Sequence, residues 1–437
     1  DNLMQGILAT KATEFDAQSI ANCFNAFASD PRPQNPALIS HLSEAALHLD
    51  NQAEGSGRLF NGQELAQVVN GLARMEVKDD LLLGKLAGYC HALAEEGGLD
   101  SQAIGLLSNG FVRLKVYNIS LMERLGACAQ ALPLDSFEDQ HIASILNAAA
   151  RCRLRDKALF KHLGLATMSL LVSPGGKLKG LTPQSLSLIF HALATLDLKA
   201  EEQALLKVLT RYTAALDWRS FSAASVANIA WSIAVLEIRG DLLGWTWEGL
   251  RYHITGMDRN SLTQVNQFLF DFALRDEGGL ETRDFEQILK LLTIVESSPK
   301  SKLKTINQGL GMSLETTSRL QSDVASTFRA MGEEVVEEWI ETRSGYSIDI
   351  WLPRVQMAIE VDGPHHFAFH RGTRAPAQAP LGSTRLKHRH LANLGIKLYS
   401  IPYYDWPRDE GIDKKRRYLE LRLLKHLATL TTSLTVA

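Results

Sequence analysis

The sequence lacks a strong excess of charge of either sign. Its 46 Lys and Arg residues are balanced by 49 Asp and Glu residues, which gives a formal net charge of −3. Proteins that coat nucleic acid without regard to sequence are usually strongly basic, so this composition argues against that class. Any binding of nucleic acid must therefore use a local basic patch.

Cysteines and long apolar runs are also scarce. The four cysteines lie far apart, and no two have metal-ligand spacing, so we expect buried thiols in a reducing compartment: Cys23, Cys90, Cys128 and Cys152. No apolar run approaches the ~20 residues of a membrane span, so we expect no membrane contact. The 437 residues suffice for two or more globular domains.

Residues 1–295 repeat a pattern with a period of about forty residues. Seven segments align without gaps over about fourteen residues, and their opening residues are Phe15, Phe60, Leu99, Phe137, Leu181, Phe221 and Met257. The spacings of 45, 39, 38, 44, 40 and 36 residues are typical of helical-hairpin repeats. Apolar residues at the fifth, ninth and twelfth positions after each opening residue predict the buried face of a first helix. We therefore expect an α-solenoid of about seven repeats.

A polar stripe lies on the opposite side of each first helix. The third, seventh and tenth positions share one helix face because they are spaced by four and three residues. The stripe is rich in amides, and its candidate RNA-binding residues are Gln63, Asn70, Gln102, Asn109, Gln140, Asn147, Gln184 and His191. Amides donate and accept hydrogen bonds, so the stripe can read an unstacked base, at about one base per repeat. Alternatively, the amides bond to the backbone of the neighbouring repeat and form a ladder that fixes the curvature of the solenoid.

A different pattern follows a polar, basic linker at residues 296–312. Short β-rich segments predict strands at Tyr346–Leu352, Val355–Val361 and Gly395–Pro402. Ser383–Leu391, between the second and third of these, is the basic start of a helix. The sequence therefore predicts a separate α/β domain at residues 313–437.

Three acids lie at the ends of the first two predicted strands. Asp349 interrupts the first strand and Glu360 the second, while Asp362 precedes a Gly-Pro turn that leads to His365 and His366. A buried carboxylate costs several kcal/mol unless it is paired, hydrogen-bonded or bound to a metal. The acids therefore mark a candidate site.

Three sequence blocks in this region resemble a RAP domain. They are Asp-Gly-Pro-His-His-Phe at 362–367, Thr-Arg-Leu-Lys-His-Arg-His-Leu at 384–391 and Ile-Pro-Tyr-Tyr-Asp-Trp at 401–406. The resemblance covers about Leu314 to Leu427. It implies an organellar RNA-binding protein and a fold similar to restriction-type endonucleases. The repeats resemble octotricopeptide-type organellar repeats more loosely, because their lengths vary.

The endonuclease-like fold implies a candidate metal site. In that fold, acids on adjacent strands hold a divalent cation such as Mg²⁺, often with a lysine two residues after the second acid. Asp349 and Glu360 occupy the acid positions and are the candidate metal ligands, but Asp362 stands where the lysine is expected. A nuclease would use Asp349, Glu360, Asp362 and His365 as catalytic residues, with His365 or His366 as the base.

The alternative for these acids is structural. Asp349 and Asp362 would cap turns, and Glu360 would pair with a basic residue of the Arg385 to His390 helix. We favour this interpretation, in which the endonuclease-like fold has an incomplete active site, catalysis is reduced or lost, and no cofactor is needed.

Basic residues are concentrated near the end of the chain. Between Arg385 and His426, eleven Lys or Arg residues face five Asp or Glu residues. This local excess of positive charge is a candidate phosphate-binding surface. The candidate RNA-binding residues of this region are His366, Arg385, Lys387, Arg389, Lys414, Lys415, Arg416 and Arg417.

Three functional hypotheses follow. The first is an RNA-binding protein of a mitochondrion, or alternatively a plastid, that processes or stabilises a transcript or holds rRNA in an organellar ribosome. Its partners would be single-stranded or ribosomal RNA and ribosomal or other ribonucleoprotein components. The second is a metal-dependent RNA endonuclease, and the third is a protein–protein scaffold that uses the solenoid alone. The chain begins at Asp1 without an Arg-rich segment, so we expect a transit peptide to be absent from it.

Overall fold

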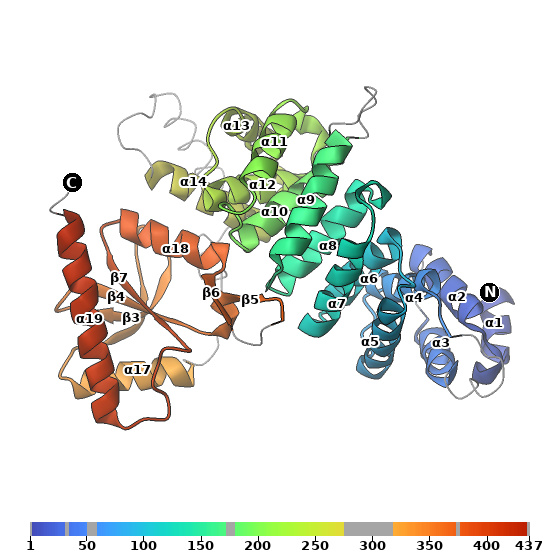
Figure 1. The fold of residues 1–437 in the computed structure, drawn as a ribbon, viewed down its shortest axis with the longest axis horizontal. Coiled ribbons are helices and arrows are strands. Elements are labelled where there is room, and N and C mark those ends of the chain that lie inside the picture. The colour runs from blue at the N-terminus through green and yellow to red at the C-terminus, as the bar shows by residue number, and fades with distance from the viewer. Residues whose placement is uncertain are drawn as a thin grey trace. The chain divides into compact units, whose positions relative to one another are not determined.

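The computed structural model describes residues 2–30, 35–49, 59–171, 180–274, 318–372 and 376–434. The chain divides into two compact units (Figure 1). Unit 1 consists of the residues up to Leu216 together with Phe369–Ala375, and unit 2 consists of Asp217–Ala368 and Pro376–Ala437.

Unit 1 is an array of paired helices that follows a short helix, α1 (Asn2–Ala9). The first helices of its five repeats are α2 (Ala17–Ser29), α4 (Gly62–Arg74), α6 (Ser101–Arg113), α8 (Asp139–Arg151) and α10 (Pro183–Thr195). The second helices are α3 (Pro36–His48), α5 (Asp80–Glu95), α7 (Ile119–Ala131), α9 (Lys157–Leu171) and α11 (Gln203–Ala214). Successive first helices pack on one another, and so do successive second helices.

The repeated sequence positions explain how these helices begin and pack. The side chains of Asp16, Asn61 and Asp100 cap three of the first helices by accepting a backbone N–H three residues later. Small residues allow adjacent first helices to approach closely: a Cβ added to Gly71 would lie 2.9 Å from the carbonyl oxygen of Phe24. The predicted core positions are buried, as shown by the fully buried Ile20, Leu65, Ile104, Ile142 and Leu186.

Unit 1 also contains a segment from much later in the chain. Strand β1 (Leu154–Arg155) pairs in parallel with Phe369 and His370 of β5 (Phe367–His370). The Arg371 guanidinium lies 3.3 Å from Asp156 Oδ2, and the Gly372 N–H donates to Glu123 Oε1 at 2.8 Å. The sequence did not predict this short strand pair, because two residues are too few to show a β pattern.

Unit 2 begins with the last repeats that the structure describes and continues into an α/β region. The repeats supply α12 (Ala223–Leu236), α13 (Leu242–His253) and α14 (Arg259–Leu274). A four-stranded sheet follows, in the order β2 (Val336–Ile340), β3 (Ser347–Leu352), β4 (Met357–Asp362) and β7 (Lys397–Pro402). The first three strands are antiparallel, and β4 and β7 are parallel.

Helices cover the sheet of unit 2 on both faces. One core contains residues of α17 (Arg319–Ala330), of the strands and of α19 (Ile412–Leu434), including Phe328, Ile359 and Leu419. A second core contains Leu391 of α18 (Gly382–Asn393), which follows strand β6 (Pro376–Pro380). Helix α18 also packs against α12 and α14. The α/β region is therefore built onto the last repeats within one compact unit.

The predicted fold class is confirmed as a helical-repeat array followed by an α/β domain. The second helix of the seventh repeat and the linker at 296–312 lie outside the described residues. The domain limits 1–295, 296–312 and 313–437 stay predictions, and the compact units divide at Leu216 because α18 packs on the last repeats. Among the helices that the structure describes, none is both long and apolar enough to cross a membrane.

Candidate functional site

The sheet of unit 2 brings the three predicted acids together. Asp349 lies on β3 beside β4, where Ile350 is paired with Ile359, and Asp362 is the last residue of β4. Because side chains alternate along a strand, Glu360 and Asp362 point to the same face of the sheet. Both are buried, with 3% and 2% of their surface exposed.

Lys387 of α18 supplies the positive charge opposite these acids. Its Nζ lies 2.6 Å from Oε2 of Glu360. Burial raises the pKa of Glu360 to about 8 and that of Asp349 to about 6, although the ammonium group of Lys387 opposes both increases. Burial alone would lower the pKa of Lys387, but the charges of Glu360 and Asp349 outweigh it and raise that pKa. One lysine faces three carboxyl groups, so the excess negative charge of the cluster favours the binding of a further proton or cation.

Asp362 is held by side chains from three elements. Its Oδ2 accepts a hydrogen bond from the hydroxyl of Ser400 on β7, and Nε2 of His388 lies 3.8 Å from the same oxygen. Nδ1 of His366 lies 3.6 Å from Oδ1 of Asp362 and 3.1 Å from the hydroxyl of Thr384. Burial lowers the pKa of His366 to about 4 and also lowers that of His388, so both rings are neutral at pH 7.

Glu360, Asp362 and His388 form a group that fits a divalent cation. One ligand atom of each lies within 4.8 Å of the others. Glu360 Oε1 and His388 Nε2 are buried and have no hydrogen-bond partner among the described residues, so both atoms could serve as metal ligands. A mixed carboxylate and imidazole set suits Mn²⁺ better than Mg²⁺, which prefers oxygen ligands. Lys387 competes with a cation for Glu360.

This grouping differs from the predicted pair of metal ligands, which stays a prediction. The sequence paired Asp349 with Glu360, but Oδ2 of Asp349 accepts the backbone N–H of Val361 at 2.6 Å, while Glu360 is grouped with Asp362 and His388. Exposed His365 is outside this group, and its ring centroid lies 4.3 Å from that of His366, with the two rings tilted by 41°.

The structure also tests the structural interpretation of the acids. The predicted pairing of Glu360 with a basic residue of the following helix is confirmed by Lys387. The predicted turn-capping roles are wrong: Asp349 bonds across two strands, and Asp362 bonds to Ser400 on the neighbouring strand. Sequence reasoning did not name His388 and did not single out Lys387 within the predicted helix as the partner of Glu360, although the basic residues of that helix indicated both.

The basic residues of α18 differ in what they contact. Arg385 is exposed, whereas Arg389 donates to Oδ1 of Asp271 at 2.8 Å and to the carbonyl oxygen of Ala234 at 2.5 Å. His390 is fully buried between the hydroxyl of Tyr346 and Asp271. An RNA contact by Arg389 would therefore compete with bonds that join α18 to the last repeats.

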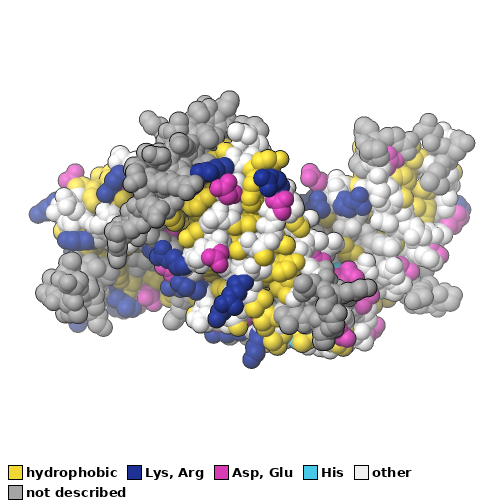
Figure 2. Space-filling view, turned by 90° about the horizontal axis from the view of Figure 1, so that it is seen from above, with side chains coloured by type: hydrophobic (Ala, Val, Ile, Leu, Met, Phe, Trp, Pro, Cys, Tyr) yellow, Lys and Arg dark blue, Asp and Glu magenta, His cyan; other side chains and the backbone are white. Residues whose placement is uncertain are grey.

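The basic residues at the start of α19 are similarly divided. Lys415 lies 2.8 Å from Asp323, and Arg416 donates to the carbonyl oxygen of Ala330 at 2.5 Å. Lys414 pairs with Glu410 at the surface, and Arg417 is exposed. Their predicted RNA contacts stay predictions. On the face shown in Figure 2, Lys and Arg side chains are scattered among acidic and apolar ones.

The predicted amide stripe is available to a ligand in the second to fifth repeats. Within the described part of the chain, its glutamines and asparagines make no side-chain hydrogen bond to protein groups: Gln63, Asn70, Gln102, Asn109, Gln140, Asn147 and Gln184. The glutamines are exposed and the asparagines are partly exposed. His191 differs, because its Nδ1 lies 3.5 Å from the Thr195 hydroxyl and burial lowers its pKa to about 4.

The same stripe forms a ladder between the sixth and seventh repeats. Gln264 donates to Oδ1 of Asn228 at 2.9 Å, and the indole N–H of Trp231 donates to Oε1 of Gln267 at 2.8 Å. Gln267 in turn lies 3.4 Å from the hydroxyl of Tyr346. Hydrogen bonds therefore connect these two repeats through the stripe, but they join side chain to side chain and not, as predicted, amide to backbone.

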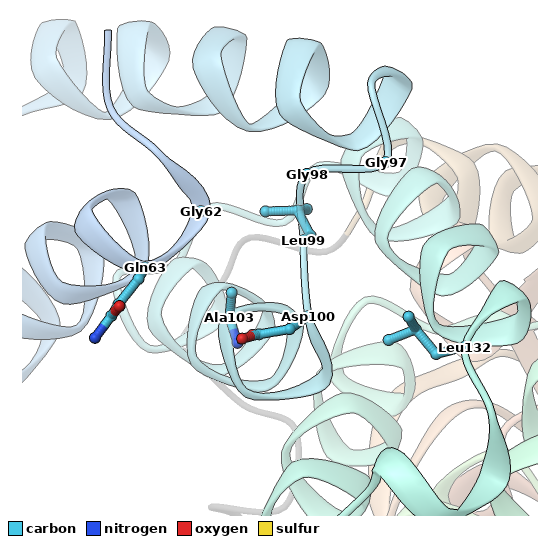
Figure 3. A pocket seen from close by; sticks show the side chains of 8 residues that line it. All are labelled: Gly62, Gln63, Gly97, Gly98, Leu99, Asp100, Ala103 and Leu132. Carbon is cyan, nitrogen blue, oxygen red and sulfur yellow. The ribbon is translucent and has the colours of Figure 1, made fainter. Parts of the chain in front are cut away.

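A pocket of about 340 Å³ opens beside Gln63 (Figure 3). It is lined by Gly62, Gln63, Gly97, Gly98, Leu99, Asp100, Ala103 and Leu132. A Cβ on Gly62 would lie 3.0 Å from the side chain of Leu99, so the second and third repeats approach closely here. Asp100 caps α6 by accepting the Ala103 N–H, which leaves Gln63 as the uncommitted polar side chain of the pocket.

Comparisons with known proteins agree with the geometry. Residues 359–421 match the RAP domain, as the sequence blocks predicted. A "RAP domain-containing protein, chloroplastic" from Oryza sativa subsp. japonica is 29% identical over 206 residues, which are 46% of this chain and 29% of that protein.

The repeats were expected to resemble octotricopeptide repeats, and the family that matches them is described as "RNA-editing substrate-binding complex 6 protein", over residues 6–277. Because this match covers more than half of the 437 residues, the chain belongs to the RNA-editing substrate-binding complex 6 protein family and carries a RAP domain.

Proposed function

We propose that this protein binds single-stranded RNA along the first helices of its repeats, as part of an organellar RNA-processing complex. The observation that carries the proposal is the contrast within one stripe. In the second to fifth repeats its amide side chains make no hydrogen bond to the described residues, whereas in the sixth and seventh they form bonds from one repeat to the other.

The chemistry of the free amides suits base edges. Each amide offers two donors and an acceptor, which is the set that unpaired bases present in return. The stripe itself carries no acid, so it does not repel phosphates. Duplex RNA hides these edges in a deep, narrow groove, and the stripe should therefore prefer single strands.

The comparisons support the cellular part of the proposal. The family name refers to RNA editing and to substrate binding, and the rice relative is described as chloroplastic. We place the protein in a mitochondrion or plastid. An RNA-processing role is favoured over an rRNA-holding role in an organellar ribosome, because the family name refers to an editing complex.

The direct test is binding of the full chain to labelled single-stranded RNA, measured by fluorescence anisotropy beside the same sequence as a blunt RNA duplex. We expect the single strand to bind at least about tenfold more tightly, a difference of about 1.4 kcal/mol. Equal affinity for both forms, or no binding to either, would refute the proposal.

A second candidate function is metal-dependent cleavage of RNA. It is favoured by the unbonded ligand atoms of Glu360 and His388 and by the position of Lys387. A bound cation would polarise a phosphate there. The protein's own contribution would be to hold that cation through Glu360 and Asp362 and to place the ammonium group of Lys387 beside it.

A further inference from the structure

The polar stripe continues one helical turn beyond its amides. The fourteenth position of each repeat follows the tenth by four residues and therefore lies on the same helix face. In three consecutive repeats this position is an arginine, namely Arg74, Arg113 and Arg151. In the other four repeats it is Ser29, Thr195, Val235 and Asp271.

The second, third and fourth repeats therefore share a pattern that the others lack. Each has Gln at the third position, Asn at the tenth and Arg at the fourteenth: Gln63, Asn70 and Arg74; Gln102, Asn109 and Arg113; Gln140, Asn147 and Arg151. The seventh position differs in each of them, as Gln67, Leu106 and Ser144. Three constant residues beside a variable one are the arrangement expected of a surface that binds a repeating polymer with different side groups.

The structure places the three arginines at equivalent points. Each is the last residue of its helix, α4, α6 or α8, and each is exposed. These helices pack directly on one another, and a Cβ on Gly110 of α6 would lie 2.7 Å from Val69 of α4. The guanidinium groups therefore follow one another at intervals of one repeat within unit 1.

The charge of these arginines is not neutralised by acids. Arg74 lies 3.3 Å from the hydroxyl of Ser29, and Arg151 lies 3.4 Å from the hydroxyl of Tyr117. None of the three forms an ion pair with a carboxylate of the described residues. A helix C-terminus carries partial negative charge and would repel a phosphate if a cation did not stand there.

We infer that the second to fourth repeats form a track for three consecutive nucleotides of single-stranded RNA, in which each arginine binds one phosphate and each asparagine one base. This inference rests on the proposed RNA-binding function, and it adds where the RNA lies on the repeats and how its phosphates and bases are oriented. The phosphates lie at the C-terminal ends of α4, α6 and α8, and the bases lie toward their N-terminal ends. Arginine suits the role because its planar guanidinium binds phosphate through two parallel hydrogen bonds.

The test uses the full chain with all three arginines changed to glutamine (Arg74→Gln, Arg113→Gln and Arg151→Gln). The matched control removes three exposed cations from the second helices α9 and α11 (Lys161→Gln, Lys207→Gln and Arg211→Gln). Both variants change the net charge equally. The affinity for a labelled single-stranded RNA is measured between 50 and 200 mM salt, and circular dichroism confirms that each variant is folded.

The arginine variant should lower the slope of log affinity against log salt by about 0.7 per contact, or about 2 in total. Between those two salt concentrations the wild type would then lose about 20-fold more affinity than the variant. The control should keep the wild-type slope. Replacing the three arginines with lysine should restore most of the slope, because a point charge still binds phosphate.

Three results would overturn the inference in distinguishable ways. If the wild type does not bind single-stranded RNA, both the proposed function and the track fail. If the wild type binds but the arginine variant keeps its slope, the track fails and the RNA-binding function stands. If poly-glutamate of equal charge displaces RNA as well as unlabelled RNA does, this face is a site for acidic protein.

Discussion

The ammonium nitrogen of Lys387 lies 2.6 Å from Oε2 of Glu360, and this pair joins α18 to the central strand β4. Glu360 is 3% exposed and the lysine side chain 23% exposed, so water screens the pair little. The state of this pair also determines whether the acidic cluster stabilises the domain or acts on a phosphate. A lysine bound to Glu360 stabilises the domain, whereas a lysine released from it could face a phosphate.

Removing Lys387 should destabilise the protein strongly. Lys387→Met leaves Glu360 and Asp349 without their counter-charge, and loss of one partner of a buried ion pair costs about 3–5 kcal/mol. The measurement is the free energy of unfolding from urea denaturation. The double variant Lys387→Met with Glu360→Gln should recover part of the loss, since it removes the stranded charge. A loss below about 1 kcal/mol in the single variant would show that the pair is not a stabilising one.

Asp349 should make the stability depend on pH. Burial raises the pKa of Asp349 to about 6, so the folded state retains a proton that the unfolded state has already released. Its contribution is therefore fully present below about pH 4 and is lost as the pH rises through 6. Asn cannot ionise, so the Tm of Asp349→Asn relative to wild type should increase between pH 5 and pH 8. Asp409→Asn, at an exposed position, is the control, and an equal trend in both would contradict the prediction.

Arg389 should stabilise the protein more than it binds RNA. Its removal leaves Asp271, which is 2% exposed, without a guanidinium partner, and we expect Arg389→Ala to cost about 3 kcal/mol. The exposed Arg417, near the start of α19, is the control, and Arg417→Ala should cost less than about 0.5 kcal/mol. A reduced salt slope for RNA binding without loss of stability would instead make Arg389 a phosphate ligand.

The amide stripe provides a matched pair of variants. Asn147→Ala should leave the stability within about 0.5 kcal/mol of wild type, because this amide has no hydrogen-bond partner among the described residues. It should change the base preference by about 1–3 kcal/mol. Gln267→Ala should cost about 1–3 kcal/mol of stability, because it removes the buried hydrogen bond from the N–H of Trp231 to Oε1 of Gln267. Its base preference should match wild type. Unfolding by urea and binding to RNAs that differ at one base provide the two measurements. If Asn147→Ala instead lowered stability and Gln267→Ala changed base preference, Asn147 would be the structural residue and Gln267 the one that contacts a base.

Local patterns in the sequence were sufficient to predict the repeats. The apolar positions recur at helical spacing in each first helix, and these residues are buried because every repeat must cover the next. The strand at Tyr346–Leu352 was predicted for the same reason, since its apolar side chains alternate. These features depend only on residues close together in the chain.

Contacts between distant residues could not be predicted in this way. Lys387 comes 27 residues after Glu360, and no spacing rule indicates that α18 places it there. The same limit applies to the stripe: Asn70 and Gln267 occupy the same repeat position, yet only Gln267 meets a partner, the indole of Trp231 in the preceding repeat. Which amides are free is therefore a property of the assembled repeats.

The protein should bind RNA without cutting it. Lys387 is held by Glu360, and Asp362 adds negative charge where charge builds up on a phosphate in the transition state. We expect an end-labelled single-stranded RNA to stay intact with Mg²⁺ or Mn²⁺ while anisotropy shows that it is bound. The wild type is compared with Glu360→Gln, which keeps the shape of the side chain and removes its charge.

Wild type and Glu360→Gln differ in the charge of the acidic cluster and have the same repeats, so a difference in cleavage between them reports on the cluster alone. If the acids are structural, Glu360→Gln changes stability and leaves the RNA intact, as in wild type. If the wild type cleaves RNA only with a divalent cation, and Glu360→Gln abolishes cleavage by orders of magnitude at unchanged affinity, the acids hold a catalytic cation. His388→Gln is then the deciding variant, because it removes a ligand of the Glu360, Asp362 and His388 group without touching the bond between Lys387 and Glu360. Cleavage that survives His388→Gln but not Asp349→Asn would restore the pair of acids that the sequence predicted.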